Sequence, residues 1–150
     1  MTRKASIPLC IGLASLLTVA SLSAHHAFSP MFDGEKMMIL KGVVTRFDWV
    51  NPHSFTYLEV KGKDGVVEHW AVEGPAAFQL NRRGMTPATV KVGDNIEVCG
   101  YGTKDGISPT KADSSVSGRV LSGELLTLHG GQKVVWSNYG QGKCLPPVLP

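Results

Sequence analysis

The sequence lacks the short motifs that identify most hydrolases, nucleotide-binding enzymes and thiol oxidoreductases. It contains no Gly-x-Ser-x-Gly elbow, no glycine-rich phosphate loop, no His-Glu-x-x-His motif and no Cys-x-x-Cys pair. Acidic residues are spread singly along β-prone segments, where a solvated strand face is the usual position. Glu73 precedes a Gly-Pro pair and could instead cap a helix start or meet Arg82 or Arg83. The sequence therefore predicts a protein that is not an enzyme, with no catalytic residues.

A long apolar run is found only near the N-terminus. Arg3 and Lys4 precede the uncharged segment 7–22, and small residues occupy positions 21–24. This order is typical of a secretory signal peptide, and the run falls short of the ~20 residues that span a bilayer. We expect residues 1–24 to be removed, with cleavage after Ser23 or after Ala24. The predicted location is periplasmic or secreted, without a permanent membrane anchor.

Charge is scarce and nearly balanced in the rest of the chain. Charged residues make up 18% and hydrophobic residues 43% of the 150 residues, which is typical of a globular protein and too apolar for disorder. The formal charge is +3, from 15 basic and 12 acidic residues. Removing Arg3 and Lys4 leaves 13 basic residues against 12 acidic ones, a charge of +1. The electrostatic case for a nucleic-acid partner largely disappears.

Cysteine is rare, and the expected cleavage makes it rarer. Of three cysteines, Cys10 lies in the signal segment, so the mature chain keeps Cys99 and Cys144. In an oxidising compartment, such a lone pair is a disulfide candidate. The bridge would tie the Gly/Pro-rich tail to the domain. Two free thiols are the alternative.

Glycine and proline divide the mature chain into short β-prone segments. The expected strands span 37–49, 54–60, 66–72, 95–101, 116–128 and 133–136. The first is apolar on both faces and contains Gly42, which suits a curved strand serving two parts of a barrel. One helix is expected at 76–83, between Pro75 and Gly84. This order predicts an all-β, OB-like barrel over residues 25–139, followed by an irregular tail at 140–150. Another small β-roll is the alternative.

Two adjacent histidines, His25 and His26, stand at the predicted mature N-terminus. An α-amino group, deprotonated amides and imidazoles form a nitrogen ligand set that Cu(II) favours. Cleavage after Ala24 would make His25 the first residue. Cleavage after Ser23 would place His26 third, so that the tripeptide could wrap the metal in a planar site. The alternative is a flexible polar terminus with incidental copper affinity.

A third histidine, His53, follows the longest predicted strand in the segment Asn51-Pro52-His53. Proline fixes a sharp turn there, which would hold the imidazole at the rim of the barrel. The functional interpretation is a ligand-facing His53 with Trp49 and Asn51 beside it. In the structural interpretation, Asn51 and His53 hydrogen-bond to backbone while Trp49 packs in the core.

Several of these segments together resemble a known family. They include the start His25-His26-Ala27-Phe28 and the segments at 40–44, 49–53, 70–73, 83–84, 92–94 and 104–106. The sequence resembles an uncharacterised family of small exported bacterial proteins with a His-His-Ser-Phe mature start and a Trp-x-Asn-Pro-His motif, classed as a domain of unknown function. Ala27 stands where the family usually has serine. The resemblance implies export and one compact β domain, and it implies no reaction.

Two classes of function remain. The first is an exported, non-enzymatic binding module whose metal ligands are His25, His26 and His53, with copper as the most concrete metal. The second is an accessory protein that binds a partner protein or a glycan through an OB-like face. The second would need exposed aromatic side chains such as Tyr57 or Tyr101 on one face.

Overall fold

The computed structural model describes residues 31–104, 119–137 and 143–144. The predicted signal peptide at 1–24, both N-terminal histidines and most of the predicted tail lie outside these residues. Within them, no helix is long and apolar enough to cross a membrane.

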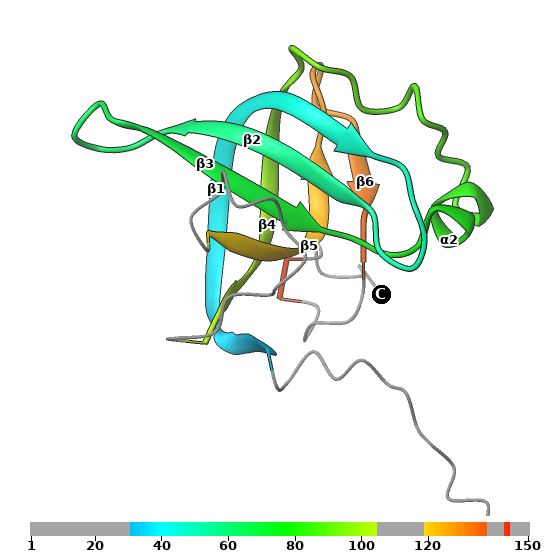
Figure 1. Ribbon diagram of the computed structural model, residues 1–150, viewed down its shortest axis with the longest axis horizontal. Coiled ribbons are helices and arrows are strands. Elements are labelled where there is room, and N and C mark those ends of the chain that lie inside the picture. Colours follow the sequence, from blue (N-terminus) through cyan, green and yellow to red (C-terminus); the bar gives the residue numbers. More distant parts are fainter. Residues whose placement is uncertain (1–30, 105–118, 138–142, 145–150) are drawn as a thin grey trace, which may run out of the picture.

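Six strands and one short helix form the described part of the chain (Figure 1). In chain order they are β1 (Phe32–Asp48), β2 (Phe55–Lys61), β3 (Val67–Glu73), α2 (Ala77–Arg82), β4 (Asn95–Thr103), β5 (Val120–Thr127) and β6 (Lys133–Val135). The strands lie in the order β3-β2-β1-β4-β5-β6, and all neighbours in that order are antiparallel. The all-β prediction is confirmed.

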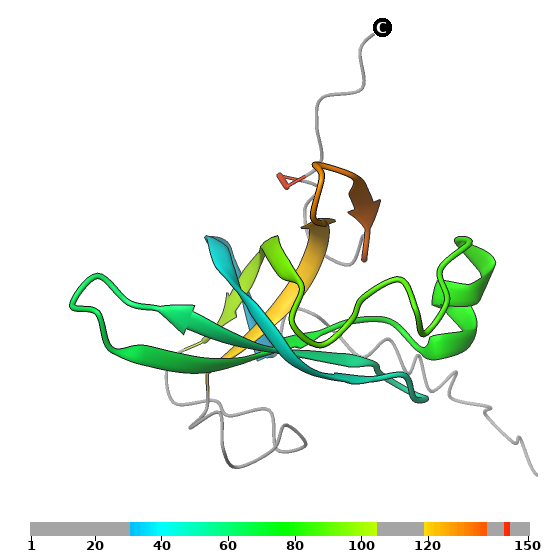
Figure 2. The ribbon, with the colours of Figure 1, turned by 90° about the horizontal axis from the view of Figure 1, so that it is seen from above.

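The long strand β1 serves two parts of the sheet, as its sequence predicted. Its first part pairs with β4 and its second part with β2, and Gly42 belongs to both pairings. A Cβ at Gly42 would lie 2.5 Å from the backbone oxygen of Glu59, so only glycine allows this close approach. The register shifts between Val44 and Arg46. The strand curves strongly across the molecule (Figures 1 and 2).

A parallel pairing between β3 and β5 closes the ring of strands. Ala71, Val72 and Glu73 pair with Val120, Leu121 and Ser122. The closed order β1-β2-β3-β5-β4, with the helix between β3 and β4, is the arrangement of an OB-type barrel. β6 adds a short sixth strand to the outer edge of β5.

The barrel interior holds the main hydrophobic core. The largest fully buried members include Trp136, Leu58, Leu80, Leu121 and Leu126. Leu80 comes from α2, so the helix contributes to the core of the sheet. The helix begins one residue later than predicted, because Ala76 is its N-cap. The side-chain Oε1 of Gln79 accepts the backbone N–H of Ala76 at 3.2 Å.

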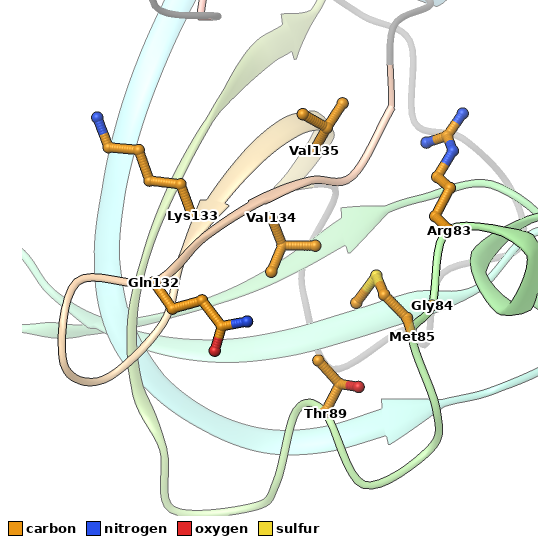
Figure 3. Close-up of a pocket in the computed structure, with 8 residues that line it drawn as sticks. All are labelled: Arg83, Gly84, Met85, Thr89, Gln132, Lys133, Val134 and Val135. Atoms are coloured by element: carbon orange, nitrogen blue, oxygen red, sulfur yellow. The ribbon is translucent and has the colours of Figure 1, made fainter.

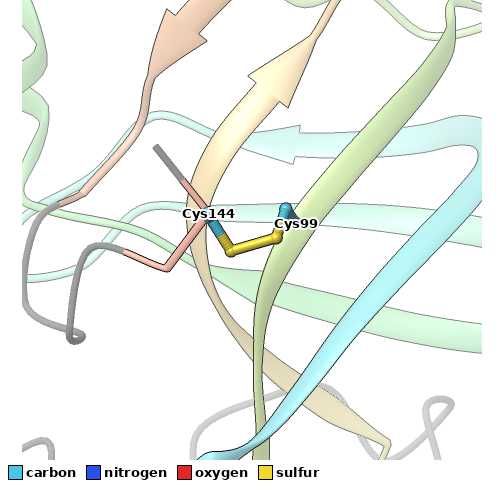
Figure 4. The surroundings of a disulfide bond; sticks show 2 residues. All are labelled: Cys99 and Cys144. Atoms are coloured by element: carbon cyan, nitrogen blue, oxygen red, sulfur yellow. A yellow bond between two sulfur atoms is a disulfide. The ribbon is translucent and has the colours of Figure 1, made fainter. Parts of the chain in front are cut away.

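The two mature-chain cysteines are joined by a disulfide bond. Cys99 lies on β4, and its bridge to Cys144 fixes residues 143–144 against the outer face of the sheet (Figure 4). Cys99, Leu125 and Cys144 form a small buried cluster there. The neighbouring Lys143 donates to the carboxylate of Glu35 at 3.0 and 3.1 Å.

Candidate functional site

The turn after β1 is fixed by backbone hydrogen bonds to the segment that leads into α2. The Gly74 N–H donates to the carbonyl of Ser54 at 2.9 Å, and the Ser54 N–H donates to the carbonyl of Pro75 at 3.1 Å. The N–H of Ala77 donates to the carbonyl of Val50 at 3.1 Å. Ser54 is fully buried, and its hydroxyl donates to Pro75 O at 2.8 Å. The turn, which contains a cis Asn51-Pro52 bond, is therefore held from both ends.

Within this turn, the imidazole of His53 meets the carboxylate of Glu73. The two atoms in contact are His53 Nδ1 and Glu73 Oε1. The His53 side chain is 28% exposed and that of Glu73 is 13% exposed. The pair therefore lies at the surface of the barrel rim, with its acidic member mostly shielded from water.

The contact fixes the orientation of the ring. In the neutral imidazole, the nitrogen that donates to a carboxylate carries the proton, so Nδ1 is protonated and Nε2 has the lone pair. Histidines that ligate metals commonly donate their other ring nitrogen to a carboxylate, which fixes the tautomer and raises the basicity of the ligand. Protonation of the ring would convert the same contact into an ion pair. The arrangement suits a ligand-binding imidazole.

The register of the β2–β3 hairpin brings Glu73 to this place. Phe55 pairs with Glu73, and Lys61 pairs with Val67 at the other end of the hairpin. The interpretation of Glu73 as a helix cap or a partner of Arg82 or Arg83 is therefore wrong, because its carboxylate faces His53 across the sheet edge. Extending the register symmetrically from the predicted 62–65 turn would pair Phe55 with Val72, one residue short of Glu73, because the observed register begins with Lys61 opposite Val67. The predicted turn alone therefore does not identify the Phe55–Glu73 pair.

The two other predicted site residues have mainly structural contacts. Trp49 is half-buried, packs against the main core and meets Phe47 edge-on, with the ring centres 5.6 Å apart. The side-chain oxygen of Asn51 accepts the backbone N–H of Phe78 at 3.4 Å. The structural interpretation thus describes Trp49 and Asn51, whereas the imidazole of His53 contacts a carboxylate side chain.

A second, smaller apolar cluster lies on the same face of the sheet as Glu73. It contains Phe32, Tyr57, Ala71, Tyr101 and Val120, and Met31 and Phe55 pack against it. Because side chains two residues apart share a strand face, the series Phe55–Tyr57 and Ala71–Glu73 marks one surface. The chain enters the described structure at Met31, on this surface.

The remaining histidines do not extend the site. His69 lies on β3 with 52% of its side chain exposed, and its Nδ1 is 4.0 Å from Glu59. His129 lies next to the 130–131 turn after β5. No group of three or more His, Cys, Asp or Glu residues that could hold a metal is present within 31–104, 119–137 and 143–144. His25 and His26 are outside these ranges.

The two tyrosines proposed as examples of aromatic residues for an OB-like binding face are buried. Tyr57 is 6% exposed and Tyr101 is fully buried. Both belong to the smaller apolar cluster. Neither ring can stack on a ligand at the surface, so these two tyrosines do not supply the exposed aromatic side chains that the second class of function would need.

The fold and site define a small OB-like barrel that carries a histidine–carboxylate pair at its rim. The chain belongs to the Family of unknown function (DUF6152), whose model matches residues 13–111. That match includes every strand from β1 to β4, as well as His53 and Glu73. No curated protein and no solved structure matches the chain.

Proposed function

We propose that this protein is an exported, non-enzymatic binding module whose site is centred on the imidazole of His53. The observation that carries the proposal is the contact between His53 Nδ1 and Glu73 Oε1. The Glu73 side chain is only 13% exposed, and burying a carboxylate costs free energy. Its contact with the half-buried imidazole orients that one ring. Such an arrangement favours a ring that presents Nε2 to a ligand.

The most concrete ligand is a metal ion, and copper fits the available donors best. Imidazole nitrogen suits Cu(II), and an N-terminal amine with neighbouring histidines adds the planar nitrogen donors that this ion prefers. The described residues contain no group of three or more potential metal ligands, so a site at His53 and Glu73 needs further ligands from elsewhere. His25 and His26 are the candidates.

The chain length permits this shared site. His26 lies five positions before Met31, and a fully extended chain spans at most about 3.6 Å per residue step, or about 18 Å in total. Met31 packs against the cluster that includes Tyr57, on the face that carries Glu73. Phe55, which packs on the same cluster, is two residues from His53. The entry of the chain on this face supports the proposal that the N-terminal imidazoles reach His53.

Metal titration of protein purified after export tests the proposal. Calorimetry with Cu(II) and Zn(II) is compared with a synthetic peptide of residues 25–31, because any exposed N-terminal histidine binds some copper. We expect the protein to bind Cu(II) more tightly than the peptide does. His53→Ala should reduce the affinity to that of the peptide, and Glu73→Gln should weaken binding about 10- to 100-fold.

His69→Ala is the matched control, because it removes an exposed strand imidazole away from the turn. Its Cu(II) affinity should equal that of the parent protein. If His53→Ala binds copper as tightly as the parent does, the shared site is refuted, and copper affinity belongs to the terminus alone. NMR of labelled imidazole, at a pH where the ring is neutral, should also report the Nδ1–H tautomer of His53 in the parent protein. Glu73→Gln should lose that tautomer preference.

A further inference from the structure

The last strand, β6, forms one edge of the sheet among the residues that the structure describes. Within the part of the chain that the structure describes, β6 pairs only with β5. The backbones of Gln132 and Trp136 are hydrogen-bonded to the β5 side. Because hydrogen-bonded positions alternate along an antiparallel strand, Val134 also turns its N–H and carbonyl toward β5. Lys133 and Val135 therefore turn theirs outward, which gives the edge two donors and two acceptors.

A cavity of about 380 Å³ runs beside this edge (Figure 3). One wall is formed by residues 132–135 and the other by residues that follow α2, from Arg83 to Thr89. The side chain of Val134 points toward Met85 and Thr89, whereas Lys133 and Val135 point the opposite way (Figure 3). Met85 is buried and Val134 is half-buried, so the floor between the walls is apolar.

The charge around the cavity has one sign. Arg83 and Lys133 line it, and the eight lining residues include no aspartate or glutamate. Arg83 NH1 donates to the carbonyl of Trp136 at 2.6 Å, which joins the end of α2 to the end of β6 and fixes the guanidinium beside the groove. Lys133 is exposed. A strand added to this edge would meet Lys133 on one face, and the apolar floor with Arg83 at its end on the other.

We propose that the edge of β6 binds an extended, acidic polypeptide segment of a partner protein as an added strand. Main-chain hydrogen bonds to Lys133 and Val135 supply the pairing, which is how sheet edges capture extended peptides. An apolar side chain of the segment fills the space over Val134 and Met85. Carboxylates of the segment alternate with its apolar side chains and lie on the face toward which Lys133 points, and this charge complementarity selects an acidic partner.

This inference is independent of the copper proposal. It gives the partner-binding class of function a different surface from the buried tyrosines. The groove lies between β6 and the segment after α2, and neither His53 nor Glu73 lines it. Failure of one proposal therefore leaves the other standing.

A defined peptide tests the inference by NMR on the ¹⁵N-labelled exported protein. The probe is the blocked pentapeptide acetyl-Glu-Val-Glu-Val-Glu-amide, and the controls are its Lys-Val-Lys-Val-Lys counterpart and a form N-methylated at alternate residues. We expect the acidic peptide to shift the amides of Lys133 and Val135 and to slow their hydrogen exchange. The basic and N-methylated peptides should leave these amides unchanged.

Two variants sharpen the test. Lys133→Glu should weaken peptide binding by about tenfold, because an attraction between exposed charges becomes a repulsion. Lys63→Glu makes the same charge change at an exposed position in the β2–β3 turn, at the far side of the molecule from β6 (Figure 1), and it should bind as the parent does. Val135→Pro removes an outward N–H that β5 does not use, whereas Val135→Thr keeps it. Only the proline variant should lose binding, with thermal melts checking that each variant is folded.

Three results would overturn the inference. The first is equal binding of the acidic and basic peptides, which removes charge selection. The second is undiminished peptide binding by Lys133→Glu, a variant that does not disturb the strand as a proline substitution could. The third is strong exchange protection of the Lys133 and Val135 amides before any peptide is added, because another part of this chain would then occupy the edge.

Discussion

Removing the bridge between Cys99 and Cys144 should cost a large part of the stability of this domain. The two residues are 45 positions apart in sequence. In the chain-entropy model, opening a loop of that size releases about 13 cal/mol/K to the unfolded ensemble, which is about 4 kcal/mol at 25 °C. Domains of this size are stable by only about 5–15 kcal/mol in total. The bridge thus supplies a quarter or more of the expected free energy of unfolding.

Lost contacts in the folded state should add little to this loss of stability. Cys99 and Cys144 are each 9% exposed and pack with Leu125 alone as a small cluster. Serine at both positions would keep the size of the side chains, so the loss of packing is small compared with the loop term. The ion pair of Lys143 with Glu35 is exposed, and such pairs contribute about 0–1 kcal/mol.

Urea unfolding of the oxidised protein and of the double variant Cys99→Ser/Cys144→Ser measures the effect. With a slope of about 2 kcal/mol/M, the midpoint should fall by about 2 M. Each single variant should match the double variant, because either substitution prevents the bridge. A double variant that unfolds at the same urea concentration as the oxidised parent would refute the reasoning, since the loop would then contribute nothing to stability.

Three further predictions concern two residues next to the His53 turn and one ion pair between strands β1 and β4. Gly74→Ala should lower the free energy of unfolding by about 1–3 kcal/mol in urea, because its Cβ would overlap the buried indole of Trp136. Ser54→Ala should cost only about 1 kcal/mol by the same assay, because the carbonyl that loses the hydroxyl still accepts the Ser54 backbone N–H. Glu97 raises the pKa of Lys41 by a hydrogen bond and by charge attraction, so Glu97→Gln should lower that pKa in an NMR titration. The small stabilisation by this pair is complete below the unfolded-state pKa of lysine and is lost as pH rises through the raised folded value.

Most of the strands could be predicted, because turn residues and β-prone runs alternate clearly. Gly62 and Gly65 flank the first hairpin, and Gly93 marks the turn into β4, so the predicted and observed bounds agree to within a few residues. The start of β1 could not be predicted. Phe32 to Lys36 are mostly polar, and they are extended because Phe32 pairs with Thr103 at the far end of β4. That reason is tertiary and has no local signal.

The site was predicted only in part, for the same reason. His53 was singled out by its turn, where proline fixes the backbone. Glu73 lies 20 residues further on, and only the register between β2 and β3 connects them. Tyr57 and Tyr101 are buried because they pack with Phe32 in the smaller apolar cluster. The pattern of a single strand does not reveal that packing. Features that one strand or turn determines could be predicted from the sequence. Contacts that require the pairing of two strands could not.

The pairing of β3 with β5 also dictates the order in which the barrel can be completed. Residues 71–73 of β3 meet residues 120–122, so this pairing waits until the chain beyond β5 has been made. The β2–β3 hairpin forms from local contacts and can be present much earlier. Until β5 arrives, the edge of β3 offers unpaired backbone groups to any other extended chain. Nascent or slowly folding molecules are therefore most vulnerable to misassembly at residues 71–73, a segment that the finished barrel hides completely at Ala71 and Val72.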